Sequence, residues 1–206
     1  MRKLLEAAGV GLTLAVGGGV AEPFFATDER SRELEDLQFT LGEGPAWEVA
    51  RGGMLLGVTD VTSSEPSLRW SMFAPEAIDR GVKSIIAVPI RTGAIKLGVV
   101  DCCRELAGFP SREGQAEALV CADAVIALAV ADVGTGGPGM AEVIDRVFAG
   151  HHDRVHQAAG MVSAQLGIGP VDALARLRAH AYADDRNLDE VAMDVVRRRI
   201  TFRSES

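Results

Sequence analysis

Residues 155–200 read VHQAAGMVSAQLGIGPVDALARLRAHAYADDRNLDEVAMDVVRRRI and predict three consecutive helices. Apolar residues recur at helical spacing, and each boundary carries a residue type that starts or stops a helix. Gly167 can take the positive φ that ends a helix, and Pro170 suits the first turn of the next one. Asn187 can cap the third helix through its side-chain oxygen. The first of these helices is expected to open after Gly139.

The residues along these helices resemble the ANTAR domain, an RNA-binding antiterminator module. The resemblance rests on HQAAGM at 156–161, Ala173, LRAHA at 177–181, and the residues NL and EVA within 187–192. It runs in register through both internal helix starts, which makes it more specific than a short motif. One departure is Ala159, where many relatives carry lysine or threonine. The resemblance implies an all-α unit that binds tandem stem-loops in nascent transcripts as a homodimer.

RNA contacts are implied for residues that match or flank this motif. The candidates are Gln157, Ala158, Gly160, Arg178, Arg186 and Asn187. The two arginines would contact phosphate or stack on a base, and the glutamine and asparagine would read base edges. The alanine and glycine would permit close approach of a helix or of the RNA backbone. Two alternatives stay open: Asn187 can act only as a cap, and the arginines at 197–199 only as partners of a helix dipole.

The charge distribution favours a local nucleic-acid contact over a general one. The net charge is −8, with 12 basic and 19 acidic groups in residues 1–139 and 9 and 10 in residues 140–206. All nine basic residues of the second part are arginine, the side chain best suited to phosphate. Because no basic field surrounds the whole protein, RNA recognition would have to be geometric.

Short apolar runs before residue 110 predict a sheet. Residues 84–90 and 95–100 are joined by a glycine-containing segment and predict an antiparallel hairpin. Residues 12–16 and 21–25 flank three glycines and predict a second strand pair, and 54–58 predicts a further strand. Ser111 can cap a following helix. Because strands and helices mix without regular alternation, an α+β fold is expected, with an antiparallel sheet flanked by helices.

Several segments of this region resemble the GAF domain. They are LQFTLGEGP at 37–45, RW at 69–70, FAP at 73–75, VPI at 88–90 and GAIKLGVVD at 93–101. The match spans residues 8–132 and implies a GAF-like fold. GAF domains sense small molecules, light or redox state, and many only pack or dimerise. The sequence does not choose among these roles and identifies no cofactor.

A small-molecule pocket in this domain would need a few polar groups in an apolar wall. The candidates are Trp47, Arg69, Trp70, Phe73 and Asp101. The alternative is that both tryptophans only fill the core or an interface. The expected layout is a sensor domain at 1–133, a glycine-rich linker at 134–139 and the three-helix domain at 140–203.

Catalytic and metal chemistry find little support in the sequence. His152 and His156 have metal-ligand spacing, but no third ligand follows at a telling distance. Cys102 and Cys103 are expected to be buried on opposite faces of a strand. No catalytic constellation emerges, so the protein is not expected to be an enzyme. Glu6 interrupts the apolar N-terminus, no segment could span a membrane, and the cytoplasm is the expected location.

Two functional hypotheses follow. The first is a transcription antitermination regulator that binds stem-loop RNA under the control of a sensor domain. The second is a sensing or dimerising protein whose three helices dock to a protein partner instead. They differ in the state of Arg178 and Arg186: ion pairs inside the fold weaken the first hypothesis, and a shared exposed face strengthens it.

Overall fold

The computed structural model describes residues 7–16, 20–52, 54–92, 95–109, 111–112, 115–116, 119–120 and 152–203. The chain divides into two compact units, Met1–Met140 and Ala141–Ser206. The expected linker at 134–139 and most of the helix expected after Ser111 lie outside the described residues. Among those that are described, no helix combines the length and apolar character that crossing a membrane requires.

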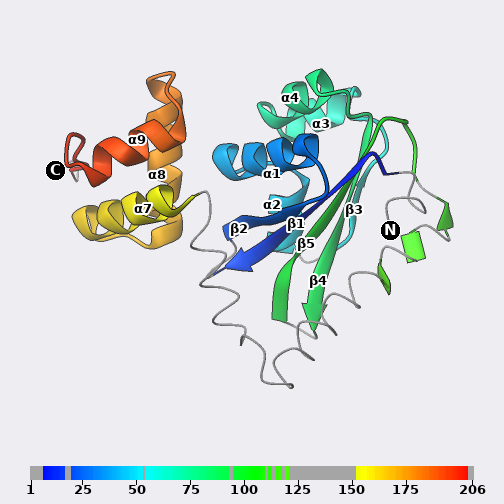
Figure 1. The fold of residues 1–206 in the computed structure, drawn as a ribbon, viewed down its shortest axis with the longest axis horizontal. Coiled ribbons are helices and arrows are strands. Elements are labelled where there is room, and N and C mark those ends of the chain that lie inside the picture. Colours follow the sequence, from blue (N-terminus) through cyan, green and yellow to red (C-terminus); the bar gives the residue numbers. More distant parts are fainter. Residues whose placement is uncertain are drawn as a thin grey trace. The chain divides into compact units, whose positions relative to one another are not determined.

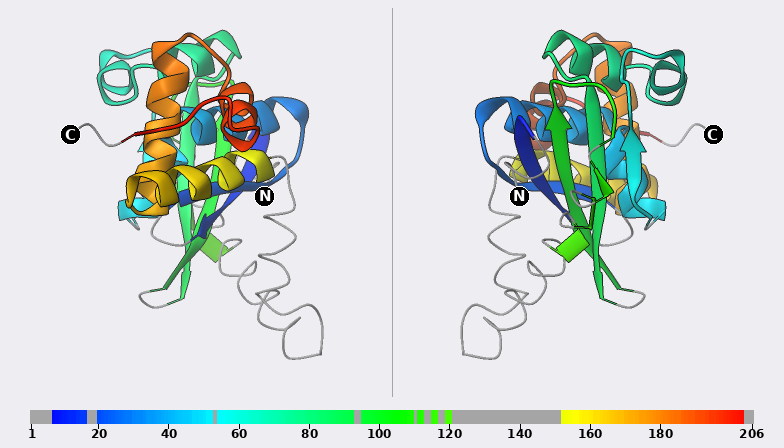
Figure 2. Two further views of the ribbon diagram at one scale, coloured as in Figure 1. Left: turned by 90° about the vertical axis from the view of Figure 1, so that its left-hand side faces the viewer. Right: turned by 90° about the vertical axis from the view of Figure 1, so that its right-hand side faces the viewer.

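The first unit contains a five-stranded antiparallel sheet. Its strands are β1 (Gly9–Val16), β2 (Val20–Ala26), β3 (Leu56–Val58), β4 (Ser84–Thr92) and β5 (Ile95–Arg104), in the order β2-β1-β5-β4-β3. The predicted hairpin of β4 and β5 is confirmed, and the two strands lie side by side in both views of Figure 2. The predicted pair of β1 and β2 is confirmed as well.

Helices line one face of this sheet, so the expected α+β architecture is confirmed. They are α1 (Glu29–Leu41), α2 (Pro45–Gly52), α3 (Ser64–Arg69) and α4 (Phe73–Asp79), of which α1 and α2 contact the strands directly (Figure 1). Strand alternation divides β5 between two cores. Cys103 packs with Leu34 of α1, whereas Cys102 packs with Val10 and Ile86 on the opposite face. The expected burial of both cysteines on opposite faces is confirmed.

Helix α1 runs unusually close to β1, and two glycines make this possible. A Cβ atom on Gly9 would come within 2.0 Å of the Ser31 hydroxyl oxygen, and one on Gly11 within 1.9 Å of a Glu35 carboxyl oxygen. Both positions lie on the helix-facing side of β1, two residues apart. The glycines therefore allow polar side chains of α1 to reach the sheet.

The second unit contains α7 (Asp153–Leu166), α8 (Pro170–Ala183) and α9 (Leu188–Val196). The predicted boundaries are confirmed: Gly167 ends α7 with a φ of 66°, Pro170 begins α8, and Asn187 caps α9. The core is formed by residues at helical spacing, namely Val155, Ala158, Ala159, Val162, Ala173, Leu174, Leu177, Ala181, Leu188, Val191, Ala192 and Val195. The first helix was expected to open after Gly139, but α7 begins at Asp153 with His152 at its N-cap, and the residues before 152 lie outside the described ones.

Candidate functional site

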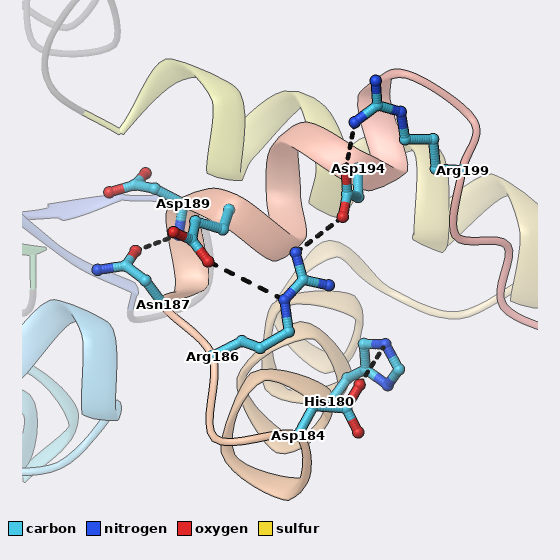
Figure 3. Close-up of polar contacts among 8 residues, drawn as sticks. His180, Asp184, Arg186, Asn187, Asp189, Asp194 and Arg199 are labelled. Carbon is cyan, nitrogen blue, oxygen red and sulfur yellow. Dashed lines mark hydrogen bonds and ion pairs between the residues drawn. The ribbon is translucent and has the colours of Figure 1, made fainter.

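Arg186 is held by carboxylates of its own unit. Its Nη2 lies 2.8 Å from Asp194 Oδ2, and its Nε lies 4.0 Å from Glu190 Oε2 (Figure 3). Arg199 binds the other oxygen of Asp194 at 3.3 Å, and the Arg186 hydrogen bond is the main cause that lowers the pKa of Asp194. Arg186 therefore links the turn before α9 to the last turn of that helix. This internal pairing weakens its assignment as an RNA ligand.

Asn187 performs the capping role that was the structural alternative for it. Its Oδ1 accepts a hydrogen bond from the backbone N–H of Asp189 at 2.8 Å, and its backbone is extended (Figure 3). This bond satisfies one of the N–H groups that a helix start leaves open. The side chain is exposed, so its amide NH₂ group remains accessible to solvent.

The candidates on α7 fall into two groups, one exposed and one buried. Gln157 and Gly160 are exposed, and a Cβ atom on Gly160 would meet no atom within 4 Å. Ala158 is 0% exposed and Ala159 is 4% exposed, so both are packed against the other helices. Of the two approaches expected at Ala158, of a helix or of the RNA backbone, its burial fits the helix, and a direct RNA contact of this side chain is corrected. A longer polar side chain at position 159 would also start from a buried position.

The arginines of the second unit are placed in different ways. Arg178 is half-buried and makes contacts, while Arg186 and Arg199 share Asp194. Five further arginines are exposed, and their side chains form no hydrogen bond or ion pair with the described residues: Arg154, Arg176, Arg197, Arg198 and Arg203. Arg176 was not predicted as a candidate. Helical spacing could have found it, because it lies away from the Ala173, Leu174 and Leu177 stripe.

The C-terminal segment after α9 folds back onto the other two helices. The Phe202 backbone N–H donates to Gln165 Oε1 of α7 at 2.9 Å, and its ring meets the His180 ring of α8 edge-on at 5.3 Å. Arg198 takes a φ of 58° where α9 ends, and the N–H groups of Arg199 and Ile200 bond the Asp194 carbonyl oxygen. The unpaired arginines of this segment are thus carried on an ordered backbone.

The five pocket candidates of the first unit have three different surroundings. Trp47 packs against Ala87 and Val99 of the sheet, whereas Trp70 and Phe73 meet edge-on at 6.2 Å in a second core cluster. Arg69 lies over the Trp70 ring at 5.1 Å and pairs with Glu48 and with Glu65, the latter at 3.0 Å. The burial of both tryptophans fits the packing alternative. Asp101 belongs to a separate polar group.

Asp101 lies in a buried cluster with Thr13, Glu35 and Gln38, which we call the carboxyl cluster. Gln38 Nε2 donates to Asp101 Oδ2 at 2.8 Å, and Thr13 Oγ1 donates to Glu35 Oε2. Glu35 is 4% exposed and Asp101 6% exposed. Except for Asp101, sequence reasoning did not select these residues. The available signal was a glutamate on the apolar stripe of α1, between Leu34 and Gln38.

Burial controls the protonation of these two acids. It is the main cause that raises the pKa of Asp101 to about 7, while the bond from Gln38 acts in the opposite direction. Burial also raises the pKa of Glu35 well above its ordinary value, and the Asp101 charge adds to this. A carboxyl group that is removed from water without a cation favours its neutral form.

Gln38 connects the carboxyl cluster to the turn that follows α1. Its Oε1 accepts from the backbone N–H of Ala46 at 2.7 Å, in the first turn of α2. Gly44 has a φ of 127°, and a Cβ atom there would come within 2.6 Å of that same oxygen. The neighbouring Glu43 accepts from the N–H groups of Met72 and Phe73, at 2.7 and 2.8 Å, where α4 begins. The turn thus joins three helices.

Comparison with known proteins gives similarities of fold only. No protein-family profile matches the chain, and no curated protein matches it in sequence. Among solved structures, a GAF domain/HD domain protein from Geobacter sulfurreducens is 19% identical, covering 65% of this chain and 86% of its own, with a TM-score of 0.45.

Two further structures are similar to the same degree. The type II free methionine-R-sulfoxide reductase from Thermoplasma acidophilum is 18% identical over 60% of this chain and 79% of its own, at a TM-score of 0.46. The GAF domain of a two-component sensor histidine kinase from Bacillus halodurans is 12% identical over 63% and 88%, at 0.45. At these values the similarities assign no function to this chain.

Proposed function

We propose that the protein is a cytoplasmic, non-enzymatic regulator that binds folded RNA through its C-terminal unit and senses a signal through a GAF-like N-terminal domain. In this proposal the RNA is a pair of stem-loops in a nascent transcript, and binding prevents transcription termination. The homodimer offers two identical three-helix units to the two loops. A small molecule in the sheet domain is the proposed signal.

The observation that carries the proposal is the set of exposed arginines whose side chains have no acidic partner among the described residues. Arg154, Arg176, Arg197, Arg198 and Arg203 lie on a unit whose charges, these arginines included, nearly balance. An unpaired guanidinium group remains fully available to phosphate oxygens, because no internal carboxylate has to be displaced. The helix boundaries also coincide with those that the ANTAR resemblance implies. These features support RNA binding more than Arg186 does.

Different residues would supply affinity and selectivity. Phosphate contacts from the unpaired arginines position the RNA but carry no sequence information. Gln157 is exposed on α7, and its carboxamide can donate to and accept from a base edge. Gly160 leaves open space one helical turn away, where an RNA loop could approach the helix backbone. Arg178 remains a candidate for stacking or phosphate binding.

A mobility-shift assay of the full chain with a tandem stem-loop RNA across a salt series tests this proposal. Removing the charge at Arg197, Arg198 and Arg203 together should weaken binding several-fold. The slope of log K against log salt should fall by the amount that up to about three phosphate contacts contribute. Gln157→Ala should weaken binding of the cognate RNA more than binding of an RNA with altered loop bases. The salt dependence of binding should stay unchanged. Lys83→Ala, which removes a charge in the sheet domain, is the matched control.

The docking alternative draws support from the internal pairing of Arg186 with Asp194. It predicts that no RNA with paired stem-loops binds above the non-specific level at physiological salt. It also predicts that the triple arginine variant behaves as the parent does toward RNA. Either result would remove the antitermination proposal and leave the three helices as a protein-docking unit.

A further inference from the structure

Glu35 and Asp101 place two acids together in the interior, and no cation of the described part of the chain lies beside them. The described residues that face the two acids from β1, β4 and α2 carry no titratable side chain. They are Gly11, Thr13, Ala87 and Ala46. Asp36 on α1 and Cys103 on β5 are the nearby titratable groups, and neither is a cation. Glu22 of β2 pairs with Leu14 and so falls on the other sheet face. Two ionised carboxylates here would repel each other at low local polarity.

The hydrogen bonds of the cluster leave a place for one proton. Asp101 Oδ2 accepts from Gln38, but the buried Oδ1 receives no N–H or O–H group from the described residues. The Glu35 carboxyl group hydrogen-bonds to Asp101 if one of the two carries a proton. Thr13 already satisfies Glu35 Oε2. A single proton therefore completes the cluster, and without it the two acids face each other as unpaired acceptors.

We propose that Glu35 and Asp101 share a proton, and that its release loosens α1 and the turn at residues 42–44, so that the sheet domain responds to proton concentration. The route is short. Gln38 holds Asp101 with its amide and the start of α2 with its carbonyl oxygen. Glu43, in the same turn, holds the start of α4. Repulsion between Glu35 on α1 and Asp101 on β5 would push α1 away from the sheet and so move the starts of both helices. This device is independent of RNA binding.

The sign of the response follows from the raised pKa of both acids. The folded domain binds more protons than the unfolded chain once the pH exceeds the ordinary carboxyl range. Stability and protection are therefore highest at acidic pH and fall as the pH rises through about 7, the value for Asp101. The raised pKa of Glu35 acts in the same direction.

Infrared spectroscopy of the full chain tests the shared proton directly. A buried protonated carboxyl group should give a carbonyl band at neutral pH that fades as the pH rises. The double variant Glu35→Gln/Asp101→Asn leaves no acid in the cluster, so it should lose the band at neutral pH. Asp79→Asn, an exposed aspartate on α4, should keep it. Absence of the band in the parent overturns the inference, as does its persistence in the double variant.

Amide hydrogen exchange tests the structural consequence. After correction for intrinsic exchange, protection across residues 29–46 should fall by up to roughly tenfold per pH unit, the limit for one linked proton, as the pH rises from the ordinary carboxyl range to about 7. In the double variant Glu35→Gln/Asp101→Asn this extra dependence should disappear while α7, α8 and α9 remain unchanged. If parent and variant show the same pH profile, the proton does not control α1 and the device is refuted, whereas the RNA-binding proposal is unaffected.

Discussion

The two units of the chain are organised by contacts of different range. In the three-helix unit the boundaries are closed locally: the Gly167 N–H bonds the Ser163 carbonyl oxygen, and Asn187 caps Asp189. In the sheet domain the deciding contacts join distant residues, such as Gln38 with Asp101. Local closure tolerates change on exposed faces, whereas long-range fit makes even a single methyl group costly. The same substitution should therefore act in opposite directions in the two units.

The largest effect is expected for Gly98→Ala in β5. A Cβ atom at this position would lie 2.3 Å from the backbone carbonyl oxygen of Thr13, which cannot rotate away as a side chain could. Relieving the overlap requires β1 and β5 to separate, and we expect a loss of about 3 kcal/mol of unfolding free energy for the sheet domain. Urea unfolding followed by tryptophan fluorescence measures it, since both tryptophans lie in this domain.

Gly52→Ala provides the control within the same domain. A Cβ atom there would meet no atom within 4 Å, so stability should change little. If Gly98→Ala is as mild as Gly52→Ala, the contact between β1 and β5 is looser than described, and the contrast between the two units loses its basis.

The same difference in range explains what the sequence could and could not predict. Pro170 and Asn187 act on the chain within a few residues, so reading the sequence located both helix starts. The β4 and β5 hairpin was also predictable, because its turn is local. The cluster of Thr13, Glu35, Gln38 and Asp101 depends on the register between β1 and β5 and on the path of α1. Neither is encoded in local spacing.

Exposure was equally hard to predict for single residues. Ala158 and Gly160 are both small and lie two positions apart, but the helix turns by about 200° between them. One therefore points into the core and the other toward solvent. The pairing of Arg186 with Asp194 crosses eight residues and a turn, and the sequence offered nearer aspartates as equal candidates.

A second prediction sharpens the role of long-range polar contacts. At about pH 8 the parent must keep Asp101 ionised in the interior, whereas Asp101→Asn avoids this cost, and we expect it to stabilise the sheet domain by about 2 kcal/mol. Because the pKa of Asp101 is raised to about 7, the advantage should shrink as the pH falls toward the ordinary carboxyl range. Urea midpoints at several pH values measure it. A constant difference across pH would contradict the assignment.

The local cap of α9 predicts a smaller effect. Asn187→Ala removes the acceptor for the Asp189 N–H and should cost the three-helix unit about 1 kcal/mol. Asn187→Asp keeps the cap and adds a negative charge. It should retain stability, which circular dichroism can follow during thermal unfolding. If Asn187→Asp nevertheless weakens RNA binding, the exposed amide has a second role beyond capping. Asn187 would then both cap α9 and contact RNA.

The smallest effect, and the one of opposite sign, is expected for Gly160→Ala. This glycine lies inside α7 with open space beside it, so alanine meets no obstacle and lowers the entropy of the unfolded chain. We expect a gain of about 0.5–1 kcal/mol in the three-helix unit, measured by thermal unfolding under circular dichroism. If the variant is more stable but binds stem-loop RNA less tightly, close approach of the RNA at this face explains a glycine that the fold does not need. Unchanged affinity would place the RNA elsewhere, toward the arginines that follow α9.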